Sequence, residues 1–286
     1  MAEPVKLISP TFSDLFEPNL EIGQFPDGDS HVRIPLLSEC KNREVIIFHR
    51  LYPKQNTGVV ALLFILDAVK NAGAKTVKIV VPYLPYARQD KQKLEGELLA
   101  ANGLCRLLKK AGADSLITFD CHFLNAEGQQ EFEGLPILNL SMGPELVKKA
   151  EEIFGGEDFE IIGPDDGSNY LVSGHGGQSM KKVRKEYDHG KIDYRDVHDI
   201  AGHLEVKGKN VLILDDMISS GSTMIKCLEK VTAAGAKNIA CAATHGLFLF
   251  DCLDRLQVFT KNIFSSDSIE NSRAMVSMKE KLTNLK

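Results

Sequence analysis

One stretch of the sequence predicts the fold: Asn210-Val-Leu-Ile-Leu-Asp-Asp-Met-Ile-Ser-Ser-Gly-Ser-Thr223. Val211 to Leu214 is a short apolar run rich in branched residues, which is typical of a strand buried on both faces of a parallel sheet. Two carboxylates follow, Asp215 and Asp216, and then a loop of small residues. Apolar residues at helical spacing come next: Met224, Cys227, Leu228 and Val231. The predicted order is therefore strand, acidic pair, small-residue loop and helix.

The loop Ser219–Thr223 has the chemistry of a phosphate site. A helix N-terminus offers unpaired N–H groups and the positive end of the helix dipole, and Ser and Thr hydroxyls add donors. Asp215 and Asp216 cannot bind a phosphate, but they can hold the hydroxyls of a sugar attached to it. The alternative is that Ser219 only caps the helix and the two acids end the strand in solvent. The acidic pair at the end of so apolar a strand favours a sugar-phosphate site.

The composition is that of a globular protein. A length of 286 residues predicts about two domains, and 43% of the residues are hydrophobic. No apolar run is long enough to span a bilayer, and the N-terminus lacks the features of a signal peptide, so we expect a cytoplasmic protein without a membrane partner. The net charge of -5 gives no reason to expect nucleic acid. The six scattered cysteines, without a Cys-x-x-Cys pair, indicate reduced core residues.

A helix-stop motif recurs in both halves of the chain. Ala-Gly-Ala-Lys occurs at 72–75 and 234–237, and Ala-Gly-Ala-Asp at 111–114, each between a helical pattern and a strand pattern. Glycine just past a helix end is ordinary capping chemistry, but its recurrence indicates two copies of an alternating β/α unit. Such sheets bind ligands beyond the carboxyl ends of their strands. Polar clusters follow the predicted strands at 82–90, 120–125, 164–168 and 215–223.

The patterns predict further elements along the chain. Strands are expected at 5–8, 45–48, 77–81, 115–119, 159–162 and 238–244. A first helix is expected to run to Asn71, with Asn56 or Thr57 as its cap. A second is expected over the segment that contains Leu98, Ala101, Cys105 and Leu108. Two more are expected at 142–154 and, broken by glycines, at 169–179. Positions 180–203 are polar and lack clear periodicity.

Two of the polar clusters have the residues of a metal site. Asp120 and His122 follow a predicted strand, and a carboxylate beside a histidine can hold a divalent cation, although a structural hydrogen-bonded pair is the simpler interpretation. Asp165 and Asp166 take the equivalent place in the second half. Acidic strand ends of this kind can flank a Mg²⁺–phosphate cluster.

Two other clusters offer cations to a phosphate. Arg88-Gln89-Asp90 provides a planar guanidinium for phosphate and an amide for a base edge or a hydroxyl, with a solvated turn as the alternative. The run Lys181–Lys185 is by default a solvated face, and the alternative is a loop that closes over a phosphate chain. Phosphoryl transfer requires mainly positioning and charge neutralisation, which such residues supply.

In combination and order, these motifs resemble the ribose-phosphate pyrophosphokinases, which make phosphoribosyl pyrophosphate (PRPP). The resemblance covers nearly the whole chain and is carried by five motifs: Phe25-Pro-Asp-Gly-Asp29 is similar to the family's nucleotide loop, Tyr86-Ala-Arg-Gln-Asp90 to its second ATP motif, Asp120-x-His122 to its metal histidine motif, Gly163-Pro-Asp-Asp-Gly167 to its second acidic site, and Lys182-x-Arg184 to its catalytic loop.

The resemblance implies a fold and an assembly. The expected fold is α/β, with two tandem phosphoribosyltransferase-like (Rossmann-like) domains and mainly parallel sheets. We expect the domains to span residues 1–140 and 141–286, with the segment Ser272–Lys286 packing on the first domain. The family also implies a homodimer or a dimer-based oligomer, in which the nucleotide loop reaches the ATP of a neighbouring subunit.

The resemblance also implies a reaction and its residues. The diphosphoryl group of ATP passes to the anomeric hydroxyl of ribose 5-phosphate with Mg²⁺ as cofactor, giving PRPP and AMP. By their match to the family's motifs, the residues fall into four groups: ATP binding by Phe25, Asp27, Asp29, Arg88, Gln89, Asp90 and His122; metal binding by His122 and Asp165; ribose 5-phosphate binding by Asp215, Asp216, Ser219, Ser220, Gly221, Ser222 and Thr223; and catalysis by Lys182 and Arg184.

The chain departs from the family pattern at several positions. Asp29 replaces a usual glutamate, Ser222 replaces a usual glycine, and Ser219 replaces an aspartate of many members, as in the shorter archaeal-like ones. The catalytic lysine is Lys182 or its neighbour Lys181. Two alternative functions are a phosphoribosyltransferase that consumes PRPP and a non-catalytic regulatory subunit related to PRPP synthetase.

Overall fold

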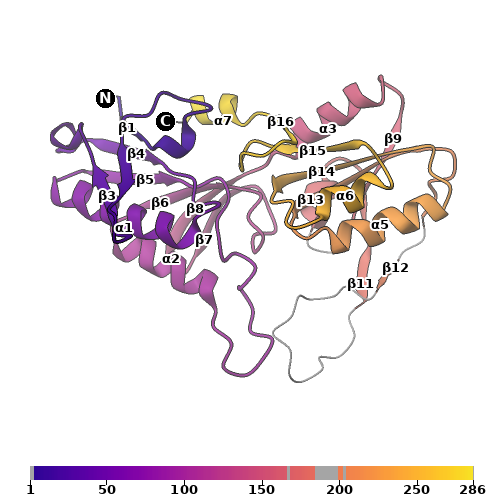
Figure 1. Ribbon diagram of the computed structural model, residues 1–286, viewed down its shortest axis with the longest axis horizontal. Coiled ribbons are helices and arrows are strands. Elements are labelled where there is room, and N and C mark those ends of the chain that lie inside the picture. The colour runs from indigo at the N-terminus through magenta and orange to yellow at the C-terminus, as the bar shows by residue number, and fades with distance from the viewer. Residues whose placement is uncertain (1–2, 166–167, 184–198, 202–203, 286) are drawn as a thin grey trace. The chain divides into compact units, whose positions relative to one another are not determined.

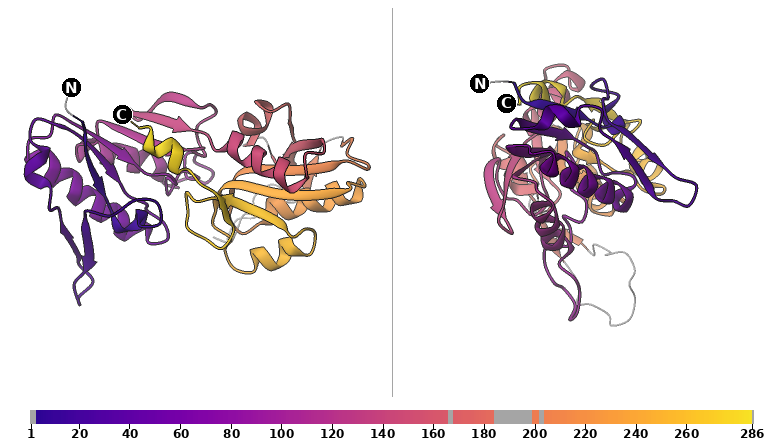
Figure 2. Two further views of the ribbon diagram at one scale, coloured as in Figure 1. Left: turned by 90° about the horizontal axis from the view of Figure 1, so that it is seen from above. Right: turned by 90° about the vertical axis from the view of Figure 1, so that its left-hand side faces the viewer.

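The structure is a computed structural model that describes residues 3–165, 168–183, 199–201 and 204–285 (Figures 1 and 2). The chain divides into two compact units, residues 1–140 with 279–286, and residues 141–278. Each unit is built on a six-stranded, mainly parallel sheet that carries helices. This is the α/β fold that the sequence predicts. No helix among the described residues is long and apolar enough to cross a membrane.

The first unit contains the following elements in chain order: β1 (Val5–Ile8), η1 (Pro10–Phe12), β2 (Glu21–Gln24), β3 (Ser30–Arg33), η2 (Leu37–Cys40), β4 (Glu44–Phe48), α1 (Gln55–Asn71), β5 (Thr76–Val80), α2 (Ala100–Lys110), β6 (Ser115–Phe119), β7 (Gly128–Phe132), β8 (Leu135–Leu140) and α7 (Lys279–Thr283). The sheet order is β1-β4-β5-β6-β8-β7, and only its edge strand β7 is antiparallel to its neighbour. Strands β2 and β3 form a separate antiparallel hairpin.

Apolar side chains fix the layers of the first unit. Helix α1 buries Leu62, Ile65, Leu66 and Val69, which recur at the spacing of one helix face. They pack on strand residues such as Ile47 and Ile79 in one core that also receives α2. Full burial of each such side chain stabilises the fold by about 1.5–3 kcal/mol. These strands therefore lie in the middle of the sheet because both of their faces are apolar, as the sequence predicts.

The second unit contains β9 (Phe159–Gly163), β10 (Gln178–Ser179), β11 (Lys181–Val183), β12 (Asp199–Ala201), β13 (Asn210–Ile218), β14 (Asn238–Gly246), β15 (Asn262–Ser266) and β16 (Ala274–Val276), and the helices α3 (Gly143–Ile153), α4 (Asn169–Ser173), α5 (Ser222–Ala233) and α6 (Cys252–Gln257). The sheet order is β10-β9-β13-β14-β15-β16, with all neighbours parallel. Helices α5 and α6 share a core with β13 and β14. Figure 1 shows α3 over the opposite face of this sheet.

The repeated helix-stop motif has the same geometry in all three copies. Helices α1, α2 and α5 each end two residues before the glycine, and that glycine has a positive φ: +86° at Gly73, +113° at Gly112 and +84° at Gly235. Two N–H groups past each helix end return to carbonyls of the last turn, for example Gly112 N to Lys109 O and Ala113 N to Leu108 O. These are Schellman ends, which require a residue that adopts the left-handed conformation easily.

Several predicted boundaries are wrong. Helix α1 begins at Gln55, so that Asn56 lies in its first turn and does not cap it. Helix α2 begins at Ala100, which leaves Leu98 outside the helix and 78% exposed. The predicted helix 169–179 is one short helix, α4, followed by the strand β10. A Cβ at position 177 would lie 2.7 Å from the Ile161 carbonyl, so the glycines allow β10 to approach β9 instead of continuing the helix.

All six cysteines are free and buried, as the sequence predicts. Cys40, Cys105 and Cys121 lie in the first unit, and Cys227, Cys241 and Cys252 in the second. Burial is the main cause that raises the pKa of the Cys105 thiol to about 12 and that of Cys252 to about 11. The thiol is therefore the dominant form of both at neutral pH.

Candidate active site

The acidic pair of the second unit lies inside a strand. The sequence predicts a strand end at Leu214, and this is wrong, because β13 continues through Asp215 and Asp216 to Ile218. Strand β14 runs beside it to Gly246, which pairs opposite Ile218 and keeps the ladder intact. Both carboxylates are therefore buried close to the carboxyl end of the sheet, with exposures of 8% and 5%.

Burial and neighbouring charges alter the pKa of Asp215. Its pKa is raised well above the ordinary value because the carboxylate is desolvated and because the charges of Asp216 and then Asp165 lie near it. The Asp216 N–H donates to Asp215 Oδ1 over 3.0 Å. An acidic cluster of this kind favours a bound cation or the hydroxyl donors of a sugar.

Asp165 belongs to the neighbouring strand end. It lies two residues after β9, the strand next to β13, and is half-buried. The turn is closed by Ser168, whose Oγ donates to the Asp165 carbonyl over 2.7 Å. The structure thus brings Asp165 into electrostatic range of Asp215. Asp166, the other acid of this motif, lies outside the described residues.

A tight turn at Gly221 connects β13 to α5. Gly221 occupies the N-cap position with φ +80° and makes no side-chain capping bond, so the alternative in which Ser219 caps the helix is wrong. A Cβ at this position would lie 2.7 Å from Cys252 Sγ. Both the left-handed conformation and the lack of space require glycine here.

The connection between β14 and α6 holds this turn in place. The N–H groups of Leu247 and Phe248 donate to the Ile218 carbonyl over 3.0 and 3.1 Å, and the Leu249 N–H donates to the Ser219 carbonyl over 3.0 Å. Phe248 itself adopts a positive φ of 45°, which is uncommon for a bulky residue. Sequence reasoning did not identify this connection as part of the site.

The hydroxyls of the turn gather where α5 begins. Ser222 and Thr223 are the first two residues of α5 and not loop residues, and Ser219 and Ser220 precede them; all four are half-buried. The Oγ atoms of Ser220 and Ser222 lie 3.3 Å apart. The first turn of a helix also leaves its N–H groups without partners inside the helix. Hydroxyl and N–H donors at a helix N-terminus, beside buried acids, can bind the phosphate and the hydroxyls of one sugar phosphate.

The structure describes one of the two predicted catalytic residues. Lys182 lies in β11, which pairs antiparallel with β12 and places its backbone opposite Ile200. Arg184 lies outside the described residues. Their roles stay predictions.

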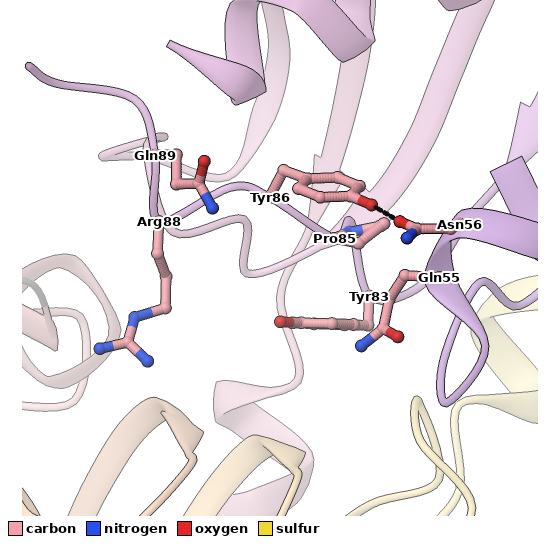
Figure 3. A pocket seen from close by; sticks show the side chains of 7 residues that line it. All are labelled: Gln55, Asn56, Tyr83, Pro85, Tyr86, Arg88 and Gln89. Carbon is pink, nitrogen blue, oxygen red and sulfur yellow. Dashed lines mark hydrogen bonds between the residues drawn. The ribbon is translucent and has the colours of Figure 1, made fainter. Parts of the chain in front are cut away.

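The first unit has a pocket at its polar cluster 82–90. A cavity of about 360 Å³ is lined by seven residues: Gln55, Asn56, Tyr83, Pro85, Tyr86, Arg88 and Gln89. Figure 3 shows the side chains of Arg88 and Gln89 and the hydroxyl of Tyr83 around the same open space. Arg88 and Gln89 are exposed and come from the segment after β5. The pocket therefore offers one guanidinium, amides and aromatic faces to a ligand.

Two of the seven lining residues were missed by sequence reasoning. Gln55 and Asn56 come from the start of α1, about thirty positions before Arg88, and their only signal was their place just after a strand and turn. Tyr83 and Tyr86 lie in the predicted polar cluster 82–90, which includes the second ATP motif, but neither was assigned a ligand. Asp90 was predicted with them, but it is not among the lining residues; it is half-buried, with Oδ2 3.9 Å from Lys91 Nζ.

His122 follows the end of β6. Asp120 turns the chain there with φ +37°; it is fully buried, and its N–H donates to the Leu140 carbonyl over 2.8 Å. The amide oxygen of Asn139 accepts from the Cys121 N–H over 3.0 Å. His122 comes two residues later and is half-buried, so its imidazole is partly open to a ligand. No group of three His, Cys, Asp or Glu side chains in the described part of the chain is arranged to hold a metal ion.

The Phe25 motif forms the tip of the β2–β3 hairpin. The Phe25 ring is 51% exposed and lies against His31 with ring centroids 5.1 Å apart. Asp27 Oδ1 accepts from the Asp29 N–H over 3.1 Å, and the Phe25 N–H donates to the Asp29 carbonyl over 2.8 Å. Asp27 and Asp29 are exposed, so the tip presents an aromatic ring and two acids to solvent.

The fold and the sites define a class of protein. Both units have the phosphoribosyltransferase type of α/β fold, and residues 175–270 match the family model of the phosphoribosyl transferase domain. Residues 15–112 match the model of the N-terminal domain of ribose phosphate pyrophosphokinase. A crystal structure of phosphoribosylpyrophosphate synthetase from Mycobacterium smegmatis has the same fold, with a TM-score of 0.79, 22% identity, and coverage of 99% of this chain and 97% of that one.

Two relatives carry the comparison beyond the fold. The ribose-phosphate pyrophosphokinase of Methanopyrus kandleri is 32% identical, over 91% of this chain and 87% of its own length. That of Pyrococcus abyssi is 30% identical, over 93% and 90%. The chain belongs to the ribose-phosphate pyrophosphokinase family.

Proposed function

We propose that the protein is a ribose-phosphate diphosphokinase, which transfers the diphosphoryl group of ATP to ribose 5-phosphate and releases PRPP and AMP. One observation carries the proposal: a turn with buried acids and a hydroxyl-rich helix start occurs in the same chain as a pocket with Arg88 and Gln89, within this family. A phosphoribosyltransferase would need the first but not the second.

Each unit takes one substrate in this proposal. In the second unit, Asp215 and Asp216 bind the ribose hydroxyls, and the segment Ser219–Thr223 binds the 5-phosphate. In the first unit, Arg88 and Gln89 bind ATP with Asp90 and His122. Buried carboxylates next to hydroxyl donors support the first assignment, and the exposed guanidinium in a cavity of about 360 Å³ supports the second.

The donor chemistry of the structure fits Mg²⁺ as the cofactor. Asp215 lies near the carboxylates of Asp216 and Asp165, whose charges help to raise its pKa. Mg²⁺ prefers such hard oxygen ligands and commonly takes one or two carboxylates together with substrate phosphates. We propose that His122 in the first unit and Asp165 in the second unit each act as a Mg²⁺ ligand. When bound, the ion neutralises charge on the phosphates and orients them.

The reaction needs little covalent help from the protein. The anomeric oxygen of ribose 5-phosphate forms a bond to the β-phosphorus of ATP, the bond from that phosphorus to the α,β-bridging oxygen breaks, AMP leaves with that oxygen, and the hydroxyl proton passes to solvent. Lys182 and Arg184 would neutralise charge on the transferring group. Holding both reactants in line supplies much of the remaining rate.

A product assay tests the function directly. Incubation with ATP, ribose 5-phosphate and Mg²⁺ should yield AMP and PRPP in equal amounts. Release of pyrophosphate from added PRPP and a nucleobase would indicate the phosphoribosyltransferase instead. If no AMP forms with any divalent ion, the proposal is wrong, and a regulatory subunit becomes the better explanation.

The catalytic lysine can be assigned by a matched pair of variants. Lys182→Ala should lower kcat by about a hundredfold, because charge stabilisation in the transition state is commonly worth this much, and should leave both KM values nearly unchanged. Lys181→Ala is the control, since it removes the same charge from the preceding residue of β11. Full activity in the first variant together with inactivity in the second would reverse the assignment.

We also propose a cytoplasmic homodimer or dimer-based oligomer. The half-exposed Phe25 at the tip of a two-stranded hairpin, together with Asp27 and Asp29, supports a role for this tip at the ATP of a neighbouring subunit. A mass measurement in solution checks the assembly, and a monomer with full activity would exclude it.

A further inference from the structure

We propose that Asn56 is a positioning residue of the nucleotide pocket, which acts on Arg88 and Gln89 through Tyr86. The inference rests on the proposed function, in that the pocket of Figure 3 is taken as the ATP site. Asn56 comes from the start of α1, whereas the other three residues come from the segment after β5. The hydrogen bond from Tyr86 to Asn56 joins these two parts of the pocket.

Tyr86 holds the segment in an uncommon conformation. Its φ is +63°, in the left-handed region that bulky residues rarely adopt. Such a conformation persists where surrounding contacts determine it. One such contact is visible in Figure 3, where the Tyr86 hydroxyl donates to Asn56 Oδ1. Without that bond the backbone at Tyr86 loses a restraint that selects this conformation.

The conformation at Tyr86 sets the place of the ligand-binding side chains. The Tyr86 carbonyl accepts from the Gln89 N–H over 2.8 Å, which closes a turn that contains Arg88. The Gln89 carbonyl in turn accepts from the Ala101 N–H over 3.3 Å, at the start of α2. The Arg88 and Gln89 side chains are exposed, so their direction depends on this backbone turn. A change at Tyr86 therefore moves the guanidinium relative to the rest of the pocket.

The first turn of α1, which carries the exposed Asn56, is held by contacts of the nearby Gly58. The Gly58 carbonyl accepts from His49 Nε2 over 3.2 Å, which leaves His49 Nδ1 to accept from Ser9 Oγ over 2.9 Å. Gly58 also packs closely, since a Cβ there would lie 3.3 Å from the Leu51 Cα. These contacts fix the first turn of α1 against the end of β4. The backbone turn that carries Asn56 is thus held in place, and Asn56 offers its acceptor to Tyr86 from that turn.

The test separates this role from a purely structural one. Asn56→Ala, Tyr86→Phe and the double variant are compared with the wild type in a kinetic assay and by direct binding of a non-hydrolysable ATP analogue. Each single change should raise KM for ATP and the analogue Kd by about three- to tenfold, the range expected for one lost hydrogen bond. KM for ribose 5-phosphate should not change. Because the two residues act through one bond, the double variant should resemble either single variant.

The chain offers a matched control on the same helix. Asn71 ends α1, and its amide donates to Asp67 over 3.0 Å on the surface, so Asn71→Ala removes an equivalent exposed bond away from the pocket. It should leave KM for ATP unchanged. Unaltered analogue binding in both single variants, or effects that add in the double variant, would overturn the inference. A wild type that binds the analogue but forms no AMP would instead refute the proposed function, while the binding data would still test the pair.

Discussion

The two candidate substrate sites follow the same type of parallel sheet but are built from different parts of the chain. In the first unit the pocket presents exposed side chains, Arg88 and Gln89, on a turn whose conformation depends on Tyr86. In the second unit the site consists of buried carboxylates within a strand and of a glycine turn packed against Cys252. The first site relies on exposed side chains, whereas the second relies on buried carboxylates and on the shape of a packed backbone turn.

This difference predicts how each site responds to substitution. A site built on exposed side chains loses affinity by increments, because each side chain contributes separately and its loss does not disturb the fold. A site built on a packed backbone turn fails as a unit, because a displaced turn misplaces all of its donors together. Three substitutions follow, in order of decreasing expected effect on activity.

Gly221→Ala should have the largest effect. The new Cβ would meet Cys252 Sγ at 2.7 Å and would hold φ +80° at a cost of about 1 kcal/mol, so the start of α5 must shift. We expect kcat/KM for ribose 5-phosphate to fall by roughly a hundredfold or more, since displacements near 1 Å can have this effect. Direct ATP-analogue binding should be unchanged.

A matched glycine provides the control for this prediction. Gly208 has φ +72° but no atom within 4 Å of an added Cβ, so Gly208→Ala has the same conformational cost without the clash. It should lower Tm by less than Gly221→Ala does and should keep activity. Partial recovery of Gly221→Ala by Cys252→Ala would support the clash as the cause. Equal activity in the two glycine variants would show that the turn is less constrained than its packing indicates.

Asp215→Asn should have a smaller effect on activity and the opposite effect on stability. The amide keeps the oxygen that accepts from the Asp216 N–H and removes a buried charge next to Asp216 and Asp165. Loss of a charged hydrogen bond to the ribose should lower kcat/KM roughly ten- to hundredfold. Relief of burial and charge repulsion should raise the Tm of the substrate-free protein. A lower Tm would mean that positive charge already balances the acidic cluster in the substrate-free protein.

Substitution of His49 should have the smallest effect on activity at neutral pH, because its main expected effect is on the stability of the first unit in acid. Burial lowers its pKa from the ordinary 6.5 to about 4, so the unfolded chain binds a proton more readily than the folded one. Stability is therefore constant above about pH 6.5 and falls as the pH drops towards 4, by roughly 2 kcal/mol at pH 5. Denaturant titrations of the wild type and His49→Gln at pH 7 and 5 measure this. The exposed His31→Gln should retain the wild-type pH slope; if His49→Gln does too, His49 is not the cause.

Much of the fold could be predicted because its signals are local. The apolar run at Val45–Phe48 and the glycine stops after α1, α2 and α5 act within a few residues of themselves, and both have the expected structure. The end of β13 could not be predicted, because the ladder continues only where β14 pairs with it, up to Gly246. Asp215 and Asp216 therefore looked like a loop start although they lie within a strand.

The residues of the candidate site also differ in whether the sequence alone reveals them. Residues with charge or hydroxyls next to a strand end, such as Asp165 and Arg88, were found from type and position. Asn56 and Cys252 were not, because each contributes by contact with a segment about thirty positions away. An ordinary helical amide and an ordinary core cysteine carry no sequence signal of such a contact.

The buried cysteines have a use beyond packing. A thiol reagent requires an accessible thiolate, and burial denies both access and charge to Cys105 and Cys252. Labelling must therefore wait until the surrounding segment opens. Since three cysteines lie in each unit, mass spectrometry of labelled peptides would time the opening of the two units separately, without any engineered probe. The rate at which the native cysteines are labelled thus reports the rate at which each unit opens.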